Sequence, residues 1–376
     1  MEQLRDYRAR SRRFDRLVGV WMSNEAVAGA VRSSVLGADG LTRKLRSKMS
    51  GSGYSSVFFV AGEMRSGTSW LRRTISAHPE ISCGGEGSFF GRDYDHEGIP
   101  VYSGPVSSLT RPFALSEDSF RAWHGMPWNA WAGDADEDLK NIVRRSVDYF
   151  LEKEVERTGK RIIGDKSPQH TENLDEIHAY YPDAKVIHII RDGRDVAVSA
   201  MNHWWRLAQD SGQPDFHLTD KELKKRDAYR ADREAFIASG SSIFAGDRLA
   251  QLARRWNYRV EKARRDGPSH FGENYLELRY EDLLARSEET VERTLDFLGA
   301  ASGDELVKRC IRASSFENAS SRRQGEEDSS SFFRKGIAGD WKNVFTERDR
   351  EVYEEIAGGL LREAGYGVGR EVGERA

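Results

Sequence analysis

The stretch GEMRSGTSW, residues 62–70, combines glycines and hydroxyl side chains in a pattern that can bind a phosphate. It follows the apolar run SVFFVAG and leads into TSWLRRTISAHPE, whose apolar residues recur with helical spacing. A strand, a glycine-containing turn and a helix in that order direct backbone N–H groups and the positive end of the helix toward one point. We therefore predict an anion site here. An ordinary strand–helix turn with an N-capping hydroxyl would use the same residues.

This loop lacks the lysine that nucleotide hydrolases place directly after the second glycine. That position is Thr68, and the cation of the stretch, Arg65, lies inside the loop. The later strand KVIHII is followed by Arg191 before Asp192, whereas a metal-binding acid normally follows such a strand directly. Both departures count against magnesium-dependent nucleotide hydrolysis.

Two further segments carry residues suited to an anion. RDGRDVAVS, residues 191–199, places Arg191 at the end of a predicted strand and Ser199 inside the next helix. FFRKGIAGDWKN, residues 332–343, has a basic tip and a flexible glycine, which can offer a phosphate both charge and N–H donors. Taken singly, the first segment would be a set of solvated salt bridges and the second a basic loop before a helix.

The elements that must position these segments alternate along the chain. The strand-like runs SVFFVAG, RIIGDK, KVIHII and NYLELRY are separated by stretches of helical periodicity. This alternation predicts an α/β fold with a central parallel sheet flanked by helices, and ligand sites at the carboxyl ends of the strands. Residues 1–52 are predicted to form an N-terminal helical extension and residues 53–376 a single domain.

The composition restricts the expected partners and compartment. A net charge of −3 over 376 residues gives no support to a nucleic-acid or anionic-membrane partner. The two cysteines, Cys83 and Cys310, are too few for a disulfide framework or a zinc knuckle. We find no apolar run of bilayer length and no signal-peptide core at the start. A soluble, cytoplasmic protein without a transmembrane segment is expected.

The three segments occur in an order that resembles the PAPS-dependent sulfotransferases, over roughly residues 57–350. FRKGIAGDWKN is similar to the cytosolic branch of that family, and RSGTSWLRRTISAHPEISCGGE to the tyrosylprotein branch. The resemblance implies a P-loop-like sulfotransferase fold for residues 53–376. It also implies the donor 3′-phosphoadenosine 5′-phosphosulfate (PAPS), which needs no metal.

The resemblance further implies how the donor is held. The 5′-phosphosulfate loop is matched by Arg65, Ser66, Gly67, Thr68 and Ser69. The 3′-phosphate site is matched by Arg191, Ser199, Arg334, Lys335 and Gly336. The positions that hold adenine are matched by the aromatic residues Trp70, Tyr280 and Phe316, each of which would also suit a hydrophobic core.

Besides Arg65, the resemblance implies three catalytic candidates. Glu86 in CGGEG has the spacing from Arg65 of the catalytic base in the tyrosylprotein branch, although an N-cap or salt-bridging acid would look the same. Lys166 in GDKSP would stabilise the leaving oxygen, since a protonated lysine cannot accept a proton. His170 is the alternative base, or a helix-entry residue. Ser88 replaces an arginine that binds the acceptor in that branch, which argues against a peptide tyrosine.

The expected activity is therefore transfer of a sulfuryl group from PAPS to a hydroxyl or amine, with release of adenosine 3′,5′-bisphosphate (PAP). The expected acceptor is a small molecule, a carbohydrate or a lipid, and the oligomeric state is left open. A non-catalytic nucleotide-binding module and a P-loop kinase are the rival functions. The joint presence of Glu86, Lys166 and Arg65 counts against the first, and the missing loop lysine against the second.

Overall fold

The computed structural model of this chain describes residues 53–87, 89–90, 124–125, 133–210, 218–314 and 336–367. Apart from Gly53, these residues belong to one compact unit, Tyr54–Ala376. The predicted N-terminal helical extension, residues 1–52, lies outside the described residues.

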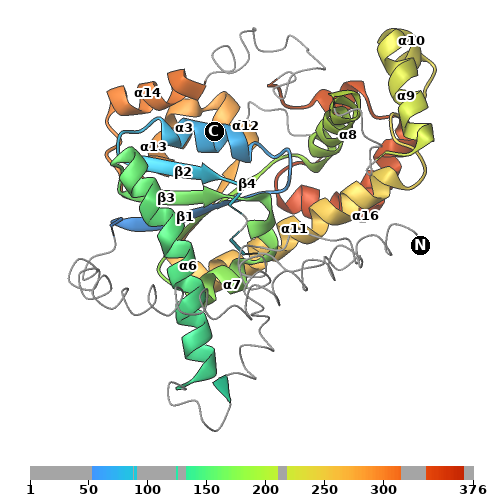
Figure 1. Cartoon of the computed structure of the whole chain (residues 1–376). Coiled ribbons are helices and arrows are strands. Elements are labelled where there is room, and N and C mark those ends of the chain that lie inside the picture. The colour runs from blue at the N-terminus through green and yellow to red at the C-terminus, as the bar shows by residue number, and fades with distance from the viewer. Residues whose placement is uncertain are drawn as a thin grey trace. The chain divides into compact units, whose positions relative to one another are not determined.

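A five-stranded sheet forms the centre of this unit, and all of its neighbouring strands are parallel (Figure 1). The strand order is β2-β3-β1-β4-β5. The bounds are β1 Ser56–Ala61, β2 Ile81–Gly85, β3 Ile162–Lys166, β4 Lys185–Ile190 and β5 Tyr275–Arg279. The predicted fold class, a central parallel sheet flanked by helices, is confirmed, and four of the strands were predicted. The analysis of the sequence did not predict β2.

One face of the sheet is covered by helices from both ends of the unit (Figure 1). They are α3 (Thr68–Ser76), α12 (Tyr280–Ala285), α13 (Ser287–Leu298) and α14 (Asp304–Ser314). Because side chains alternate along a strand, Phe58 and Val60 of β1 point to this face and pack with Leu71 of α3 and Leu295 of α13. The core on this face therefore fixes α3 directly behind the glycine loop.

The opposite face is covered by α6 (Ala135–Thr158), α7 (Leu174–Tyr180) and α11 (Arg248–Phe271). Phe59 of β1 is fully buried there and packs with Leu151 of α6 and Ile177 of α7. The short 3-10 helices η1 (Pro168–Glu172) and η2 (Gly272–Asn274) follow β3 and α11. Thus η1 joins the carboxyl end of β3 to this layer.

A second group of helices packs beside the carboxyl ends of the strands. It contains α8 (Gly193–Asp210), α16 (Glu347–Glu363) and the short helix η3 (Asp340–Asn343), with α9 (Asp220–Ala231) and α10 (Arg233–Ala238) further out (Figure 1). Trp205, Trp256 of α11 and Tyr353 are the largest of the almost fully buried side chains in its core. This core anchors α8, which begins just after β4. Among the described helices none is long and apolar enough to cross a membrane.

Candidate functional site

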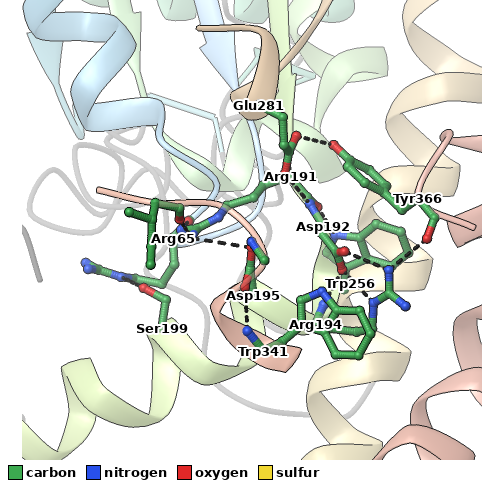
Figure 2. Close-up of polar contacts among 12 residues, drawn as sticks. Arg65, Arg191, Asp192, Arg194, Asp195, Ser199, Trp256, Glu281, Trp341 and Tyr366 are labelled. Atoms are coloured by element: carbon green, nitrogen blue, oxygen red, sulfur yellow. Dashed lines mark hydrogen bonds and ion pairs between the residues drawn. The ribbon is translucent and has the colours of Figure 1, made fainter. Parts of the chain in front are cut away.

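The carboxyl ends of β1 and β4 bring two of the predicted anion segments into contact (Figure 2). Arg191, which directly follows β4, donates from Nη1 to the Arg65 carbonyl oxygen at 3.1 Å. Arg65 in turn donates from Nε to Ser199 Oγ of α8 at 3.1 Å. Because Ser199 accepts this hydrogen bond, its O–H group can donate to an anion at the same place. Residues far apart in sequence are thus assembled at one sheet edge.

The loop between β1 and α3 has the backbone of an anion cradle. Gly67, the N-cap of α3, has φ +97°, and a Cβ there would approach the Tyr280 ring to 2.5 Å, so glycine is required. Ser66 Oγ is buried and has no hydrogen-bond partner within the described ranges. Thr68 and Ser69 are the first residues of α3, whose N-terminus carries positive partial charge. An unsatisfied hydroxyl at a helix N-terminus suits a phosphate group.

Buried charges hold the base of this loop. Glu63 is 1% exposed and accepts the Ser66 N–H at its carbonyl oxygen, at 3.0 Å. Its carboxylate forms ion pairs of 2.9 Å with Arg255 and with Arg259 of α11, and Arg259 also pairs with Glu172 of η1 at 2.5 Å. Burial alone would raise the pKa of Glu63, but the two arginines hold that pKa below its ordinary value. The loop is therefore tied to α11 and η1.

Two of the three predicted adenine-site residues lie together beside Arg191. The Arg191 guanidinium stacks over the Tyr280 ring at 4.3 Å, and the Trp70 ring meets Tyr280 edge-on at 5.5 Å. Trp70 Nε1 donates to the Ser314 carbonyl oxygen at 2.9 Å, which fixes the indole. Phe316 lies outside the described residues. The aromatic cluster adjoins the cation expected to bind a phosphate.

The start of α8 also holds the described end of the late glycine segment. Asp195 accepts the backbone N–H of Gly339 at 2.6 Å and of Trp341 at 2.9 Å, and Arg191 Nη2 donates to the Ile337 carbonyl oxygen at 3.1 Å (Figure 2). Burial raises the pKa of Asp195, although Arg191 opposes the shift. Gly336 therefore lies next in sequence to a residue bound by Arg191. Arg334 and Lys335 lie outside the described residues.

The remaining charges of the RDGRD motif are buried rather than solvated. Asp192 and Arg194 form an ion pair of 2.7 Å, and Arg194 donates to the Tyr366 carbonyl oxygen at 2.7 Å. The Arg194 guanidinium also stacks over the Trp341 ring at 3.8 Å (Figure 2). Asp192 and Arg194 thus brace the C-terminal segment, while Arg191 of this motif and Ser199 of α8 contact the loop.

Glu86 and Lys166 meet at the carboxyl ends of β2 and β3. Gly85 and Lys166 are partners in the sheet register, and the next amide, Glu86 N, donates to the Lys166 carbonyl oxygen at 2.7 Å. Lys166 Nζ donates to Glu86 Oε1. The lysine side chain is 3% exposed and the glutamate side chain 61% exposed. The pair thus presents a carboxylate to solvent, with a buried cation behind it.

Two of the predicted catalytic residues also have an unusual backbone conformation. Among the described residues, Arg65 and Glu86 are the two non-glycine residues with φ in the left-handed region, at +71° and +55°. Such a conformation costs on the order of 1–3 kcal/mol and persists where the surrounding structure over-determines it, most often at functional sites. In the part of the chain that the structure describes, the predicted loop cation and the predicted base are therefore the two non-glycine positions with this strained backbone.

His170 lies in a buried polar cluster around Asp165. Its side chain is fully buried, and Nε2 lies 2.9 Å from Asp165 Oδ2. Ser167 donates to the same oxygen at 2.8 Å, while Gly87 N donates to Asp165 Oδ1 at 2.9 Å. The His170 ring also packs edge-on against Phe59 in the core. In this arrangement His170 contacts a carboxylate rather than the exposed surface.

His203 lies within the electrostatic influence of Arg65 and was not among the site residues predicted from the sequence. It lies one helical turn after Ser199 on α8, a spacing that could have revealed it. Burial, then the positive charges of Arg65 and Arg206, lower the pKa of His203 to about 4. A neutral imidazole therefore lies within the field of the loop arginine at neutral pH. Asp165 was also missed, because the sheet register, rather than the local sequence, brings its carboxylate to Gly87 N.

Comparison with known proteins identifies the sulfotransferases as relatives of this chain. The sequence model of the sulfotransferase domain matches residues 56–365. Sulfotransferase 2A2 of Rattus norvegicus is 28% identical over 209 residues, which are 53% of this chain and 62% of that protein. Sulfotransferase 2A1 of Homo sapiens is 26% identical over 182 residues, which are 46% of this chain and 55% of that protein. The matches thus span less than two thirds of the length of these relatives.

Solved structures of sulfotransferases are also similar to this chain. The mouse sulfotransferase SULT7A1 complexed with PAP has 17% sequence identity and a TM-score of 0.45, covering 82% of this chain and 85% of that chain.

Proposed function

Because this chain belongs to the sulfotransferase domain family, we propose that it transfers a sulfuryl group from PAPS to a hydroxyl or amine of a small-molecule, carbohydrate or lipid acceptor. One observation carries the proposal. The glycine loop, the strand-end arginine and the helical serine converge through the hydrogen bonds of Arg65 with Ser199 and of Arg191 with the Arg65 carbonyl. PAPS carries phosphate groups at two positions, and a site that binds both must supply cations and hydroxyl groups where these three segments meet.

The residues present fit such a donor. Ser66 Oγ, buried and without a partner among the described residues, and the N-terminus of α3 would hold the 5′ group together with Arg65, Gly67 and Thr68. Ser69 would add a further hydroxyl. Arg191 and Ser199 would hold the 3′-phosphate by charge-assisted hydrogen bonds. Gly336, Arg334 and Lys335 remain proposed members of that site.

Tyr280 and Trp70, which form one aromatic cluster beside Arg191, would hold adenine. Phe316 remains a proposed neighbour of this cluster. Bound PAPS would supply an activated sulfuryl group with a phosphate as leaving group, so the chain's own task is to orient the acceptor and move one proton.

Glu86 is the proposed base for that proton. Its exposed carboxylate can accept the proton of an acceptor O–H or N–H, as a general base does. Lys166, buried and hydrogen-bonded to Glu86, holds the carboxylate in place and supplies positive charge where negative charge develops. Arg65 adds a second cation from the loop. His170 is the alternative base, but its contact with Asp165 and its full burial favour Glu86.

Ligand binding separates this function from its rivals. Thermal-shift and calorimetric titrations with PAP, and with ATP plus Mg²⁺, with and without chelator, measure which nucleotide is recognised. PAP at 100 times its Kd should stabilise the protein by about 2.7 kcal/mol, with no effect of chelator. Stabilisation by ATP plus Mg²⁺ alone would contradict the proposal and favour a kinase. PAP binding without any transfer from PAPS to a broad acceptor panel would favour a non-catalytic module.

A further inference from the structure

The strained backbone of Glu86 is held by two consecutive amide groups that bind to β3. Glu86 N donates to the Lys166 carbonyl oxygen at 2.7 Å, and Gly87 N donates to Asp165 Oδ1 at 2.9 Å. The first acceptor is backbone, but the second is a side chain on the residue next to Lys166. The carboxylate of Asp165 is thus the side-chain group that fixes the residue after Glu86.

The fit around Gly87 is tight. A Cβ at this position would lie 2.9 Å from Asp165 Oδ1 and 2.7 Å from the Phe89 ring, so the backbone is enclosed from two sides. Glycine is therefore needed for Gly87 N to approach the carboxylate. Because the Gly87 backbone is enclosed in this way, the turn that carries Glu86 keeps one conformation as long as the Asp165 side chain keeps its orientation.

Asp165 is itself fixed by buried partners. Its second oxygen, Oδ2, accepts from Ser167 Oγ at 2.8 Å and lies 2.9 Å from His170 Nε2. Asp165 is 2% exposed, and both partners are fully buried. Although burial would raise it, hydrogen bonds from His170, Ser167 and Gly87 hold the pKa of Asp165 below its ordinary value. The carboxylate is therefore charged and locked in one orientation at neutral pH.

We infer that Asp165 is a positioning residue for Glu86, and that Ser167 and His170 act on the reaction only by orienting Asp165. The inference rests on the proposed function, because it assigns a role in sulfuryl transfer to groups that do not touch the substrates. It also gives the buried His170 a role other than that of a base. The hydrogen bond to Gly87 N, rather than the negative charge, is the feature that carries the effect.

Two substitutions separate the hydrogen bond from the charge. Asp165→Ala removes the acceptor for Gly87 N, and kcat for PAP formation from PAPS should fall about 10–100-fold, the scale of a base displaced by about 1 Å. Asp165→Asn keeps an oxygen acceptor of the same size and should retain kcat within about threefold. The Kd for PAP should stay within about twofold in both variants. Asn as inactive as Ala would overturn the inference in favour of charge.

Asp349 offers a matched control. It is also buried and accepts one backbone amide, from Thr346 at 3.0 Å, and one serine hydroxyl, from Ser242 at 2.8 Å, but it lies at the start of α16. Asp349→Ala should lose stability as Asp165→Ala does, while kcat stays within about twofold. In hydrogen exchange, only Asp165→Ala should accelerate exchange in the peptide 81–90. If Asp165→Ala and Asp349→Ala lost kcat equally, the loss would be explained by general destabilisation, and the inference would be overturned.

A double-mutant comparison tests whether Asp165 acts through Glu86. In a Glu86→Gln background, Asp165→Ala should cause almost no further loss of kcat, because the group that it positions is already disabled. Multiplicative losses would overturn the inference. If Asp165→Ala does not fold, Ser167→Ala and His170→Asn carry the same test, with smaller losses that also vanish in that background. Failure of the proposed function would look different, since the wild type would then form no PAP from PAPS.

Discussion

Replacing Glu63 with glutamine tests how the donor loop is held, because it removes one charge from a group of four in which Glu63 and Arg259 are buried. Glu63 and Glu172 are balanced by Arg255 and Arg259 in the native chain. The variant keeps the size of the side chain but leaves two guanidinium groups with one carboxylate. Breaking a buried pair in this way typically costs about 3–5 kcal/mol. The Arg255 side chain is 28% exposed and can be partly rehydrated, so we expect the lower end, about 3 kcal/mol.

The assay is urea denaturation at pH 7 together with a thermal melt. A loss of about 3 kcal/mol should lower the Tm by roughly 5–10 °C in a domain of this size. Because the folded pKa of Glu63 lies below its unfolded value, its stabilisation is present above about pH 4.5 and is lost as pH falls through the folded pKa. The difference between wild type and variant should therefore shrink only at acidic pH.

The control is Glu351→Gln. Glu351 pairs with Arg348 at 2.9 Å, the same distance as the two Glu63 pairs, but the two side chains are 59% and 76% exposed. Exposed pairs often contribute nothing measurable, so this variant should melt with the wild type. If Glu63→Gln were no less stable than Glu351→Gln, the reasoning that burial makes the loop anchor strong would be refuted.

The other predictions concern the site itself. Arg191→Ala should weaken PAP binding by about 1.5–3 kcal/mol and adenosine 5′-phosphate binding far less, as measured by calorimetry; equal losses would show that Arg191 does not hold the 3′-phosphate. Glu86→Gln should lower kcat roughly 10²–10⁴-fold with PAP affinity retained, whereas an active Glu86→Gln beside an inactive His170→Asn would transfer the role of base to His170. The folded pKa of His203, about 4, lies below its unfolded value. Protonation of His203 should therefore reduce the stability of the protein as pH falls from about 6.5 toward 4. Between pH 7 and pH 5, His203→Gln should lose less free energy of unfolding than the wild type, as measured by denaturation. Identical losses would contradict the lowered pKa of His203.

The sequence predicted the parts of the fold that rest on local pattern. The apolar run of β1, the glycine loop and α3 follow one another without a break, so periodicity and turn chemistry identified all three. The segment Arg191–Ser199 likewise appears as a strand end and a helix, and the structure brings both residues to the loop. The resemblance to sulfotransferases is confirmed at the level of the family.

Other features depend on contacts that no local pattern encodes. The strand β2, Ile81–Gly85, ends in Gly84 and Gly85, which disfavour strands, and it forms by pairing with β3. Asp165 looks in sequence like a neighbour of Lys166, and only the sheet register places its carboxylate against Gly87 N. Taken singly, the RDGRD motif indicates solvated salt bridges, but the C-terminal segment covers Arg194. Tertiary packing decided each case.

Transfer of labelled sulfur from PAPS is the measurement that tests the account most directly. Wild type and Glu86→Gln would be incubated with ³⁵S-labelled PAPS and a panel of phenols, alcohols, sugars, lipids and amines, without added metal and with chelator present. We predict that the wild type moves label to at least one class of acceptor and releases one PAP for each sulfate transferred, while Glu86→Gln binds PAP normally but transfers label at least about 100-fold more slowly. Label that stays on PAPS with every acceptor, from a folded protein that binds PAP, would contradict the proposed activity.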